Sequence, residues 1–168
     1  MNRRKKKPAT PPSRLKRPCS SGQILKTARK NRTVFLVAPR DRLIAPAEAV
    51  RLARKLVTDP YKEHFIAIYL SARNDVVKTE LVSLGTLNAS IVHPREVFRP
   101  AIMSRACAII VLHNHPSGDV SPSESDLELT KRLKNAGQLL GIEVLDHVIF
   151  EKGDRFYSFE NKKRDDNA

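Results

Sequence analysis

The feature that most limits the folds open to this chain is an apolar run that ends directly at two histidines. Residues 107–112 are short, uncharged and rich in β-branched side chains, which predicts a buried strand, and Pro116 and Gly118 turn the chain immediately afterwards. Residues at i and i+2 of an extended segment point to the same side, so His113 and His115 are expected to converge from one face. That geometry suits a divalent metal ion.

The segment after the two histidines leads into a helical pattern, and a carboxylate lies at its start. Leucines recur at helical spacing through residues 127–140, so Asp126 falls in the first turn of that helix. Two imidazole nitrogens and one carboxylate oxygen are ligands that zinc accepts, and a catalytic zinc site leaves its fourth position open to water. The sequence therefore nominates His113, His115 and Asp126 as three protein ligands.

Simpler interpretations of these residues remain open. A His-x-His pair beside a turn is usually two ordinary histidines. Ser123-x-x-Asp126 ahead of an apolar run is also a capping box, in which the serine bonds to the amide of Asp126 and the aspartate reaches back. The cap is compatible with metal binding, because the contacts that start the helix would also fix the direction of the carboxylate.

The complete spacing, His113-x-His115, seven residues, Ser123, two residues and Asp126, resembles the JAMM signature of the MPN-type metalloproteases. The run His-Asn-His-Pro-Ser-Gly-Asp, followed by Pro-Ser, resembles the bacterial RadC branch of that family. The resemblance extends over residues 43–161. It implies one Zn²⁺ ion per chain, with His113, His115 and Asp126 as its ligands.

The same resemblance implies two catalytic residues. In JAMM enzymes a glutamate at the start of a strand is the general base, and Glu63, just before the apolar residues 65–70, is the best positional match. A carboxylate beside the metal can take a proton from the attacking water and return it to the leaving amine. Without the resemblance Glu63 would be an exposed charge at a strand end. Glu80, in the middle of the next strand, is the competing candidate. The family assigns a hydrogen bond to the tetrahedral oxyanion to the serine at the position of Ser123.

Alternating strand and helix patterns predict an α/β fold, a mixed β-sheet flanked by helices, and the resemblance implies the same architecture in MPN (JAMM) form. The expected helices are 46–57, 94–106 and 123–136, the last ending near Gly137 or Gly141, and the expected strands are 63–70, 76–84, 107–112, 142–150 and 156–159. Residues 22–32 predict a short basic helix and 33–38 a strand or extended segment. The domain is expected to be single and to span 43–161, followed by a flexible C-terminus at 162–168.

Polar residues in otherwise apolar elements need an explanation of their own. Asp146 and His147 interrupt the apolar strand 142–150, which favours a buried hydrogen-bonded pair over a supporting contact to the metal site. His93 precedes a proline that opens a helix, and we expect it to be structural or to contact substrate rather than to be a fourth ligand.

The compartment is predicted from cysteines and from hydropathy. Cys19 lies in the N-terminal segment and Cys107 in the expected buried strand, so a disulfide between them is not expected and a reducing compartment fits. No apolar run approaches the ~18 residues that a membrane span requires, and the first residues lack the apolar stretch of a secretory signal. These features predict a cytoplasmic protein without a membrane partner.

The positive charge is concentrated at one end of the chain. Residues 1–40 contain thirteen Lys or Arg and no Asp or Glu, whereas residues 41–168 contain eighteen of each sign. Residues 1–32 therefore predict a disordered basic arm that attracts nucleic acid through its phosphates without sequence preference. A solvated tail that aids solubility is an equally good interpretation, since no aromatic residue precedes Phe35 to stack on bases.

These observations lead to two hypotheses for function. The first is a zinc metallopeptidase that hydrolyses a peptide or isopeptide bond of an unidentified protein substrate with metal-activated water. The alternative is a DNA-associated repair or recombination accessory protein that binds nucleic acid through residues 1–40. The chain is expected to lack the helix-hairpin-helix portion that precedes this domain in full-length RadC proteins. A zinc nucleobase deaminase is excluded, because its motif requires glutamate where His115 stands.

Overall fold

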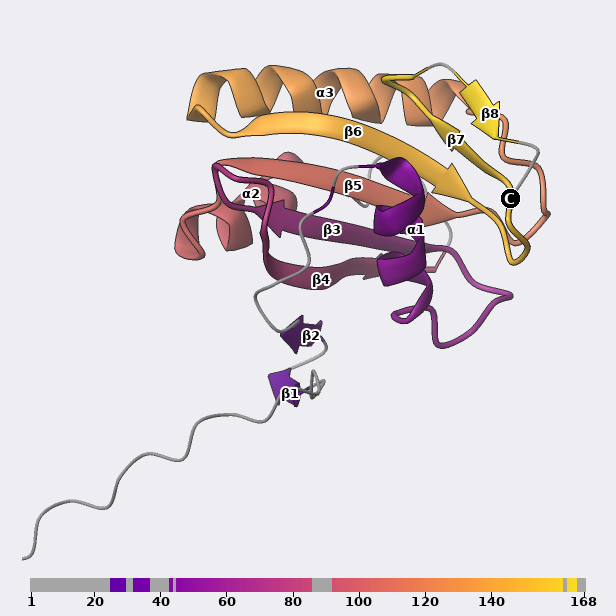
Figure 1. Ribbon diagram of the computed structural model, residues 1–168, viewed down its shortest axis with the longest axis horizontal. Helices are drawn as coiled ribbons and strands as arrows, with labels where there is room; N and C mark the ends of the chain where they lie inside the picture. Colours follow the sequence, from indigo (N-terminus) through magenta and orange to yellow (C-terminus); the bar gives the residue numbers. More distant parts are fainter. Residues whose placement is uncertain are drawn as a thin grey trace, which may run out of the picture.

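The computed structural model of the chain describes residues 25–29, 32–36, 43, 45–85, 92–161 and 163–165. Within these residues eight strands form one sheet in the order β1-β2-β4-β3-β5-β6-β7-β8, and three helices pack on it (Figure 1). The strands are β1 Leu25–Arg29, β2 Arg32–Leu36, β3 His64–Leu70, β4 Val76–Leu84, β5 Ala108–Asn114, β6 Glu143–Phe150, β7 Phe156–Ser158 and β8 Lys163–Asp165. The helices are α1 Pro46–Arg54, α2 Pro94–Met103 and α3 Glu124–Leu140.

The sheet is mixed, as the sequence predicts. Neighbouring strands are antiparallel except for β5 and β6, which run parallel because helix α3 connects them as a crossover. Strands β3 and β4, both predicted, pair as a hairpin, with His64 opposite Leu84 and Leu70 opposite Val76. The predicted α/β class is therefore confirmed.

The helices cover both faces of the sheet, so the central strands are buried on both sides. In β3, alternate residues enter different cores: Ile66, Ile68 and Leu70 pack with α1, while Phe65 and Tyr69 pack with α2 and α3. Strand β5 alternates in the same way. This alternation decides where the polar end of β5 points: His113 lies on the face of α2 and α3, and its neighbour Asn114 on the face of α1.

Each helix begins where the sequence predicts and ends near a local signal. Helices α1 and α2 open with a proline in the first turn and stop about three residues before the predicted ends at 57 and 106. Helix α3 continues past Gly137 to Gly141, whose φ of 66° forms the left-handed cap that glycine tolerates. Gly137 lies within the helix and closely approaches the chain that enters β6: a Cβ there would lie 2.5 Å from the carbonyl oxygen of Ile142, just before that strand.

The helix predicted at 22–32 is wrong. Residues 25–29 form strand β1, which pairs antiparallel with β2 from Leu25 opposite Leu36 to Arg29 opposite Arg32. Strand β2 pairs in turn with β4 at Val34 opposite Glu80. Inter-strand hydrogen bonding at the sheet edge outweighs the weak helical preference of this short segment. The remainder of the predicted basic arm lies outside the described residues.

Cys107 also differs from its prediction. Strand β5 begins one residue later, at Ala108, and the thiol of Cys107 is exposed and free. Cys19 lies outside the described residues. None of the helices in the described part of the chain combines the length and apolar character that a membrane span needs.

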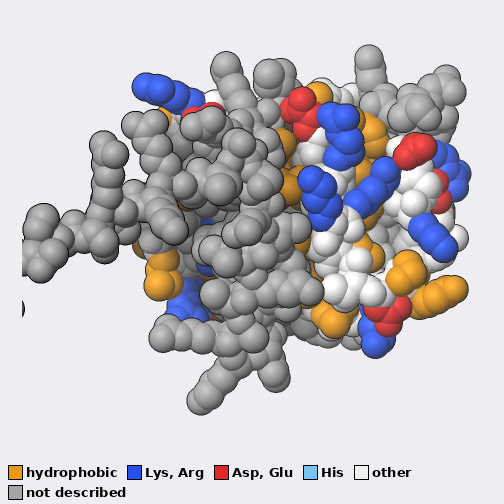
Figure 2. All heavy atoms as spheres, turned by 60° about the horizontal axis from the view of Figure 1, so that its bottom comes forward, with side chains coloured by type: hydrophobic (Ala, Val, Ile, Leu, Met, Phe, Trp, Pro, Cys, Tyr) orange, Lys and Arg blue, Asp and Glu red, His pale blue; other side chains and the backbone are white. Residues whose placement is uncertain are grey.

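Charged groups of both signs share the surface. On the face drawn in Figure 2, the described residues present Lys and Arg side chains interspersed with acidic and hydrophobic ones, beside atoms whose placement is not described. This mixture agrees with the balanced charge of residues 41–168, which contain eighteen basic and eighteen acidic residues. The net charge of the protein therefore resides in its N-terminal segment.

Candidate metal centre

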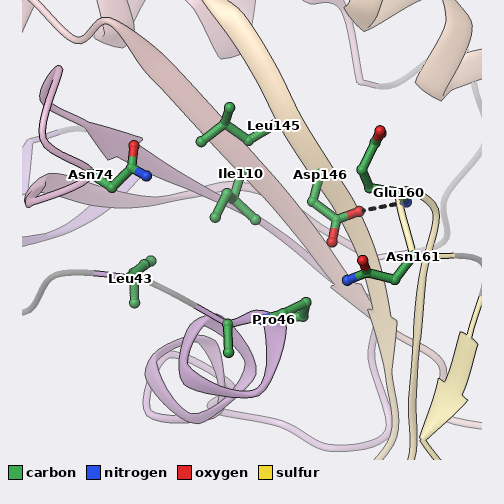
Figure 3. Close-up of a pocket in the computed structure, with 9 residues that line it drawn as sticks. Leu43, Pro46, Asn74, Ile110, Leu145, Asp146, Glu160 and Asn161 are labelled. Atoms are coloured by element: carbon green, nitrogen blue, oxygen red, sulfur yellow. Dashed lines mark hydrogen bonds between the residues drawn. The ribbon is translucent and has the colours of Figure 1, made fainter.

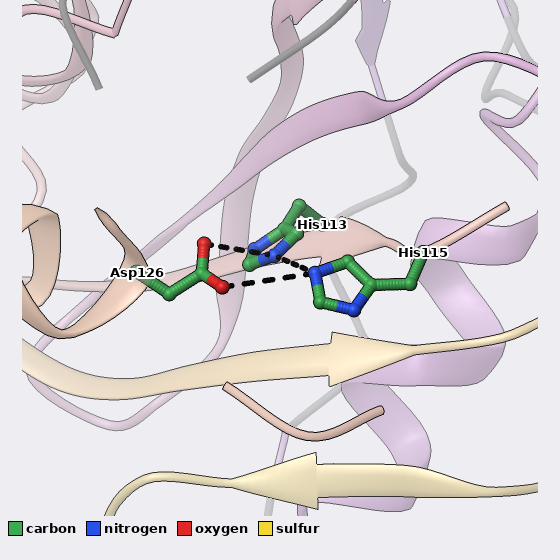
Figure 4. A group of neighbouring side chains, drawn as sticks. All are labelled: His113, His115 and Asp126. Atoms are coloured by element: carbon green, nitrogen blue, oxygen red, sulfur yellow. Dashed lines mark hydrogen bonds and ion pairs between the residues drawn. The ribbon is translucent and has the colours of Figure 1, made fainter. Parts of the chain in front are cut away.

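The three predicted ligands lie together at the carboxyl end of β5. His113 is the last but one residue of the strand, His115 follows its end, and Asp126 lies in the first turn of α3 (Figure 4). One nitrogen or oxygen of each residue falls within 4.8 Å of those of the other two. Among the described residues, this is the one group of three or more His, Cys, Asp or Glu side chains with metal-binding geometry.

The distances between these donor atoms fit a tetrahedral site. His113 Nε2 lies 2.9 Å from His115 Nε2 and 3.2 Å from Asp126 Oδ1, and His115 Nε2 lies 3.7 Å from Asp126 Oδ2. Ligands on a tetrahedral zinc at about 2.0–2.1 Å lie about 3.3 Å from one another. The observed distances lie on both sides of that value, so the side chains present can hold a zinc ion with little movement.

The capping box of α3 orients the carboxylate. The Ser123 amide and hydroxyl both donate to Asp126 Oδ2, at 2.8 and 2.6 Å, and the Asp126 amide donates to the Ser123 hydroxyl at 3.2 Å. These contacts confirm the cap that the sequence predicts. They leave Asp126 Oδ1 directed at His113, where a ligand oxygen is required.

The two histidines are held by different partners at their other ring nitrogens. His115 Nδ1 lies 2.5 Å from the carbonyl oxygen of Asp119, which can only accept, so this nitrogen carries a proton. His113 Nδ1 lies 2.9 Å from Nε2 of His147 on β6, and His147 Nδ1 lies 2.6 Å from the hydroxyl of Thr130 on α3. In both ligands the other nitrogen, Nε2, faces the proposed ion.

The pairing predicted for Asp146 and His147 is wrong, since adjacent residues of a strand point to opposite faces. The Asp146 carboxylate instead accepts from the Ser158 hydroxyl at 2.6 Å and the Glu160 amide at 3.1 Å, and burial raises its pKa. His147 faces α3 and contacts His113. His147 therefore contacts a candidate metal ligand, which is the interpretation that the sequence had favoured less.

The electrostatics of the cluster favour a shared cation. Burial lowers the pKa of His113 despite the Asp126 carboxylate beside it. Burial also opposes protonation of His115, but the Asp126 carboxylate and the Asp119 carbonyl outweigh it and raise the pKa of His115. The Asp126 carboxylate is partly desolvated, yet hydrogen bonds from His113, His115 and Ser123 hold its pKa far below the usual range.

Glu63 lies one residue before β3, and its backbone is held on both sides. The side chain of Asn114 accepts from the amide of His64 at 2.7 Å and donates to the carbonyl of Lys62 at 3.0 Å. The Glu63 carbonyl accepts from the amide of Gly85 at 2.9 Å. The charge of the Glu63 carboxylate favours the protonated forms of His113 and His115, although burial still lowers the pKa of His113. Its role as general base stays a prediction, as does the oxyanion role of Ser123.

The other candidates raised by the sequence have structural positions. Glu80 is buried and pairs with Lys78, whose ammonium lies 2.8 Å from its carboxylate. His93 is exposed and caps α2, with its Nδ1 accepting from the Arg95 amide at 3.3 Å. Among the described residues, neither belongs to the group of candidate ligands, and the possible roles of Glu80 as a base and of His93 as a substrate contact stay untested.

A small cavity lies on the other face of the sheet. It has a volume of about 160 Å³ and lies between the start of α1 and strands β5 and β6, with Pro46, Ile110 and Asp146 in its wall (Figure 3). Its lining includes none of His113, His115 and Asp126. The cavity is therefore separate from the candidate metal centre.

Sequence reasoning missed the supporting residues Thr130 and Asn114 and underrated His147. Thr130 lies four residues after Asp126, the spacing at which helical side chains share a face, which is a usable signal. Asn114 offered none beyond its place between two histidines. Its partners lie fifty residues or more earlier in the chain.

Comparison with known proteins places this domain among relatives. The family described as RadC-like JAB domain matches residues 43–164. A UPF0758 protein of Methanosarcina mazei is 42% identical over 139 residues, which cover 83% of this chain and 60% of the relative. A UPF0758 protein of Shouchella clausii is 50% identical over 109 residues, 65% of this chain and 47% of the relative. The chain thus spans about half to three fifths of the length of these relatives.

Proposed function

This chain belongs to the RadC-like JAB domain family, and from that premise we propose that it is a zinc-dependent metallohydrolase that cleaves a peptide or isopeptide bond. One observation carries the proposal: Nε2 of His113, Nε2 of His115 and the carboxylate of Asp126 converge within 4.8 Å. Three protein ligands leave a position for water and substrate, which is the arrangement of catalytic rather than structural zinc.

We assign different roles in hydrolysis to Glu63 and Ser123. When bound, zinc would supply Lewis acidity and an acidified water molecule. Glu63 would accept a proton from the attacking water and return it to the departing amine nitrogen, so that one carboxylate would serve first as base and then as acid. Ser123 holds Asp126 in place through two hydrogen bonds to Oδ2 and stands beside the site, where its hydroxyl can turn to a developing oxyanion.

Metal content is the first test. Purified wild-type protein is expected to bind about one zinc ion per chain, and His113→Ala and Asp126→Ala are expected to lose it, as measured by elemental analysis after dialysis. His93→Ala is a matched control, because His93 is an exposed cap away from the ligands. Wild-type protein that takes up no zinc even when the ion is supplied would end the hydrolase proposal.

The general base is tested separately from the ligands. Glu63→Gln is expected to keep its zinc and to lose about 10²–10⁴-fold in hydrolysis of a peptide or isopeptide library, because it can no longer accept the proton. Glu80→Gln is the matched control and is expected to keep activity, since Glu80 pairs with Lys78 at 2.8 Å. If Glu80→Gln were the inactive variant, the roles of the two carboxylates would be reversed.

We also propose, on the separate ground of charge, that residues 1–40 bind nucleic acid. Thirteen basic and no acidic residues in this segment support binding to phosphates. Replacing the five basic residues of 3–7 by glutamine is expected to weaken binding to duplex DNA and to reduce its salt dependence by about 0.9 in log–log slope for each phosphate that is no longer neutralised. Unchanged affinity and slope would assign this segment a role other than DNA binding.

A further inference from the structure

We propose that His147 and Thr130 are positioning residues that hold His113 in the tautomer with a proton on Nδ1 and a lone pair on Nε2. The inference rests on the proposed function only in that the lone pair serves a metal ion. The proposal is based on a series of hydrogen bonds that runs from α3 through β6 to β5, and all of its members are described residues. In each bond, the preceding group determines which atom is the donor and which is the acceptor.

The chain starts at a group that can only accept. The carbonyl oxygen of Asp126 lies 2.6 Å from the Thr130 hydroxyl oxygen, and two oxygens at that distance require a hydrogen between them. A carbonyl has none, so the single hydroxyl proton of Thr130 points to Asp126. Thr130 is therefore left as an acceptor toward its other neighbour.

That neighbour is His147, whose Nδ1 lies 2.6 Å from the same hydroxyl oxygen. Because Thr130 has no second proton to give, His147 Nδ1 must carry the hydrogen of this bond. His147 is fully buried, and its ring is stacked on Phe159 at 4.8 Å between centroids and meets Phe65 edge-on at 5.9 Å. No hydrogen-bonded carboxylate accompanies the ring within the described part of the chain, so it stays neutral and its Nε2 carries a lone pair.

The last link reaches the metal ligand. His147 Nε2 lies 2.9 Å from His113 Nδ1, and because the first is an acceptor the second must be the donor. A neutral imidazole has one N–H, so the lone pair of His113 falls on Nε2. That nitrogen is the one at 2.9 Å from His115 Nε2 and 3.2 Å from Asp126 Oδ1.

The tautomers of the two candidate histidine ligands are therefore fixed by different hydrogen-bond acceptors. His115 uses a carbonyl of its own loop, at Asp119, whereas His113 is surrounded by core residues and must reach across to another strand. The chain of bonds also returns to its origin, since Asp126 supplies both a candidate ligand oxygen and the carbonyl that orients Thr130. Helix α3 thus positions the candidate ligand Asp126 and, through Thr130, also determines the tautomer of His113.

The tautomers can be measured directly in the full-length, zinc-free protein. Long-range ¹⁵N–¹H NMR of labelled imidazoles, recorded at a pH above the range where His115 holds its extra proton, is expected to show Nδ1 protonated and Nε2 bare in both His113 and His147. Protonation of His113 on Nε2 would overturn the proposal. This readout requires neither metal nor substrate, so it remains decisive even if the protein proves not to bind zinc.

Zinc affinity of Thr130 variants provides the second arm. Thr130→Val keeps the shape and removes the acceptor, and a loss of about 10–100-fold in zinc affinity is expected, measured by competition with a chromophoric chelator. Thr130→Ser keeps the hydroxyl and is expected to stay near wild type. A packing role alone would give the opposite ranking, because Val fills the site better than Ser.

Thr79→Val makes the same change at a buried threonine of β4, two strands away from β5, and is expected to leave zinc affinity unchanged. Thermal unfolding of the zinc-free variants establishes that each one is folded. If wild type binds zinc and Thr130→Val binds it equally well, the positioning role is refuted while the metallohydrolase proposal stands. If wild type binds no zinc, that proposal fails, and the NMR result alone decides the tautomer.

Discussion

Asn114 stands between two candidate ligands but works on the opposite side of the sheet. Its carboxamide satisfies the His64 amide at 2.7 Å and the Lys62 carbonyl at 3.0 Å, the two peptide groups that flank Glu63. Asn114 and His64 are both buried, so the His64 amide depends on Asn114 for its hydrogen bond, whereas the Lys62 carbonyl also lies 2.8 Å from His64 Nδ1. The end of β5 therefore directs histidines toward the proposed metal ion and an asparagine toward the segment that contains Glu63, the proposed base.

Replacing Asn114 by alanine is expected to loosen the Glu63 segment while sparing the metal. The His64 amide loses its partner, whereas the Lys62 carbonyl keeps its contact with His64 Nδ1 at 2.8 Å, so the free energy of unfolding should fall by about 1–3 kcal/mol in urea titrations. Hydrogen exchange at the amides of His64 and Gly85 should accelerate, and zinc affinity should stay within about twofold of wild type. Protected amides in the variant would show that the strand pairing, not Asn114, holds this segment.

Helix α3 links the site to the core through one glycine. Gly137 lies on the buried side of the helix, and a Cβ there would come within 2.5 Å of the Ile142 carbonyl and 3.2 Å of a methyl group of Val144. The close approach lets the helix lie directly on the strand that follows it. At the scale of elements, this packing fixes the distance between α3, which carries Asp126 and Thr130, and β6, which carries His147.

Gly137→Ala is therefore expected to destabilise the protein even though alanine is the better helix former. The overpacking should cost about 1–3 kcal/mol, which exceeds the gain of about 1 kcal/mol in helix propensity. Chemical denaturation measures the difference. Gln138→Ala, at an exposed neighbour, should change stability by less than about 0.5 kcal/mol. A stabilised Gly137→Ala variant would mean that α3 can move away from β6 at little cost.

Across the whole molecule, buried histidines tie stability to pH. Burial lowers the pKa of His113 below 6.5 and that of His147 well below it, so both stay neutral in the folded protein while the unfolded chain takes up protons. Stability from these two groups is present above about pH 6.5 and is lost as pH falls below it. His115 acts in the opposite direction: its raised pKa contributes stability below 6.5 that is lost as pH rises through the folded-state value.

The zinc-free protein is thus expected to unfold at lower temperature as pH falls from about 6.5 to 5, because burial lowers the pKa of His147 well below its ordinary value and lowers that of His113 too. Asp126 should add a further loss only as pH approaches 3.8, since its pKa is held below that value. Differential scanning calorimetry over this range measures the effect. The variant His147→Gln removes one titrating group and should show a shallower decline. A melting temperature that rose toward pH 5 would contradict the predicted balance.

Added zinc should reverse much of this loss near neutral pH. An ion that binds only the folded state stabilises it by about 2.7 kcal/mol at a hundredfold excess over its dissociation constant. Protons compete for His115, so the zinc-induced rise in melting temperature should shrink as pH falls. The same rise should be absent from His113→Ala at every pH.

Short-range patterns along the chain were sufficient to predict the local features of the fold and the site. The His-x-His spacing at a strand end, the capping box from Ser123 to Asp126 and the prolines that open α1 and α2 are all decided within one turn or one pleat, where local geometry leaves few choices. The mixed α/β class followed from the order of such elements. The predicted ligands were therefore found together.

Tertiary structure decided which distant residues support the site. His147 meets His113 because β5 and β6 pair with Val111 opposite His147, and Asn114 reaches Lys62 because β3 pairs with Phe65 opposite His113. These strands lie far apart in the sequence, so their register depends on how their apolar faces pack against the helices on both sides of the sheet. Tertiary pairing also turned residues 25–29 into an edge strand, since a partner strand, not the segment itself, fixed their conformation.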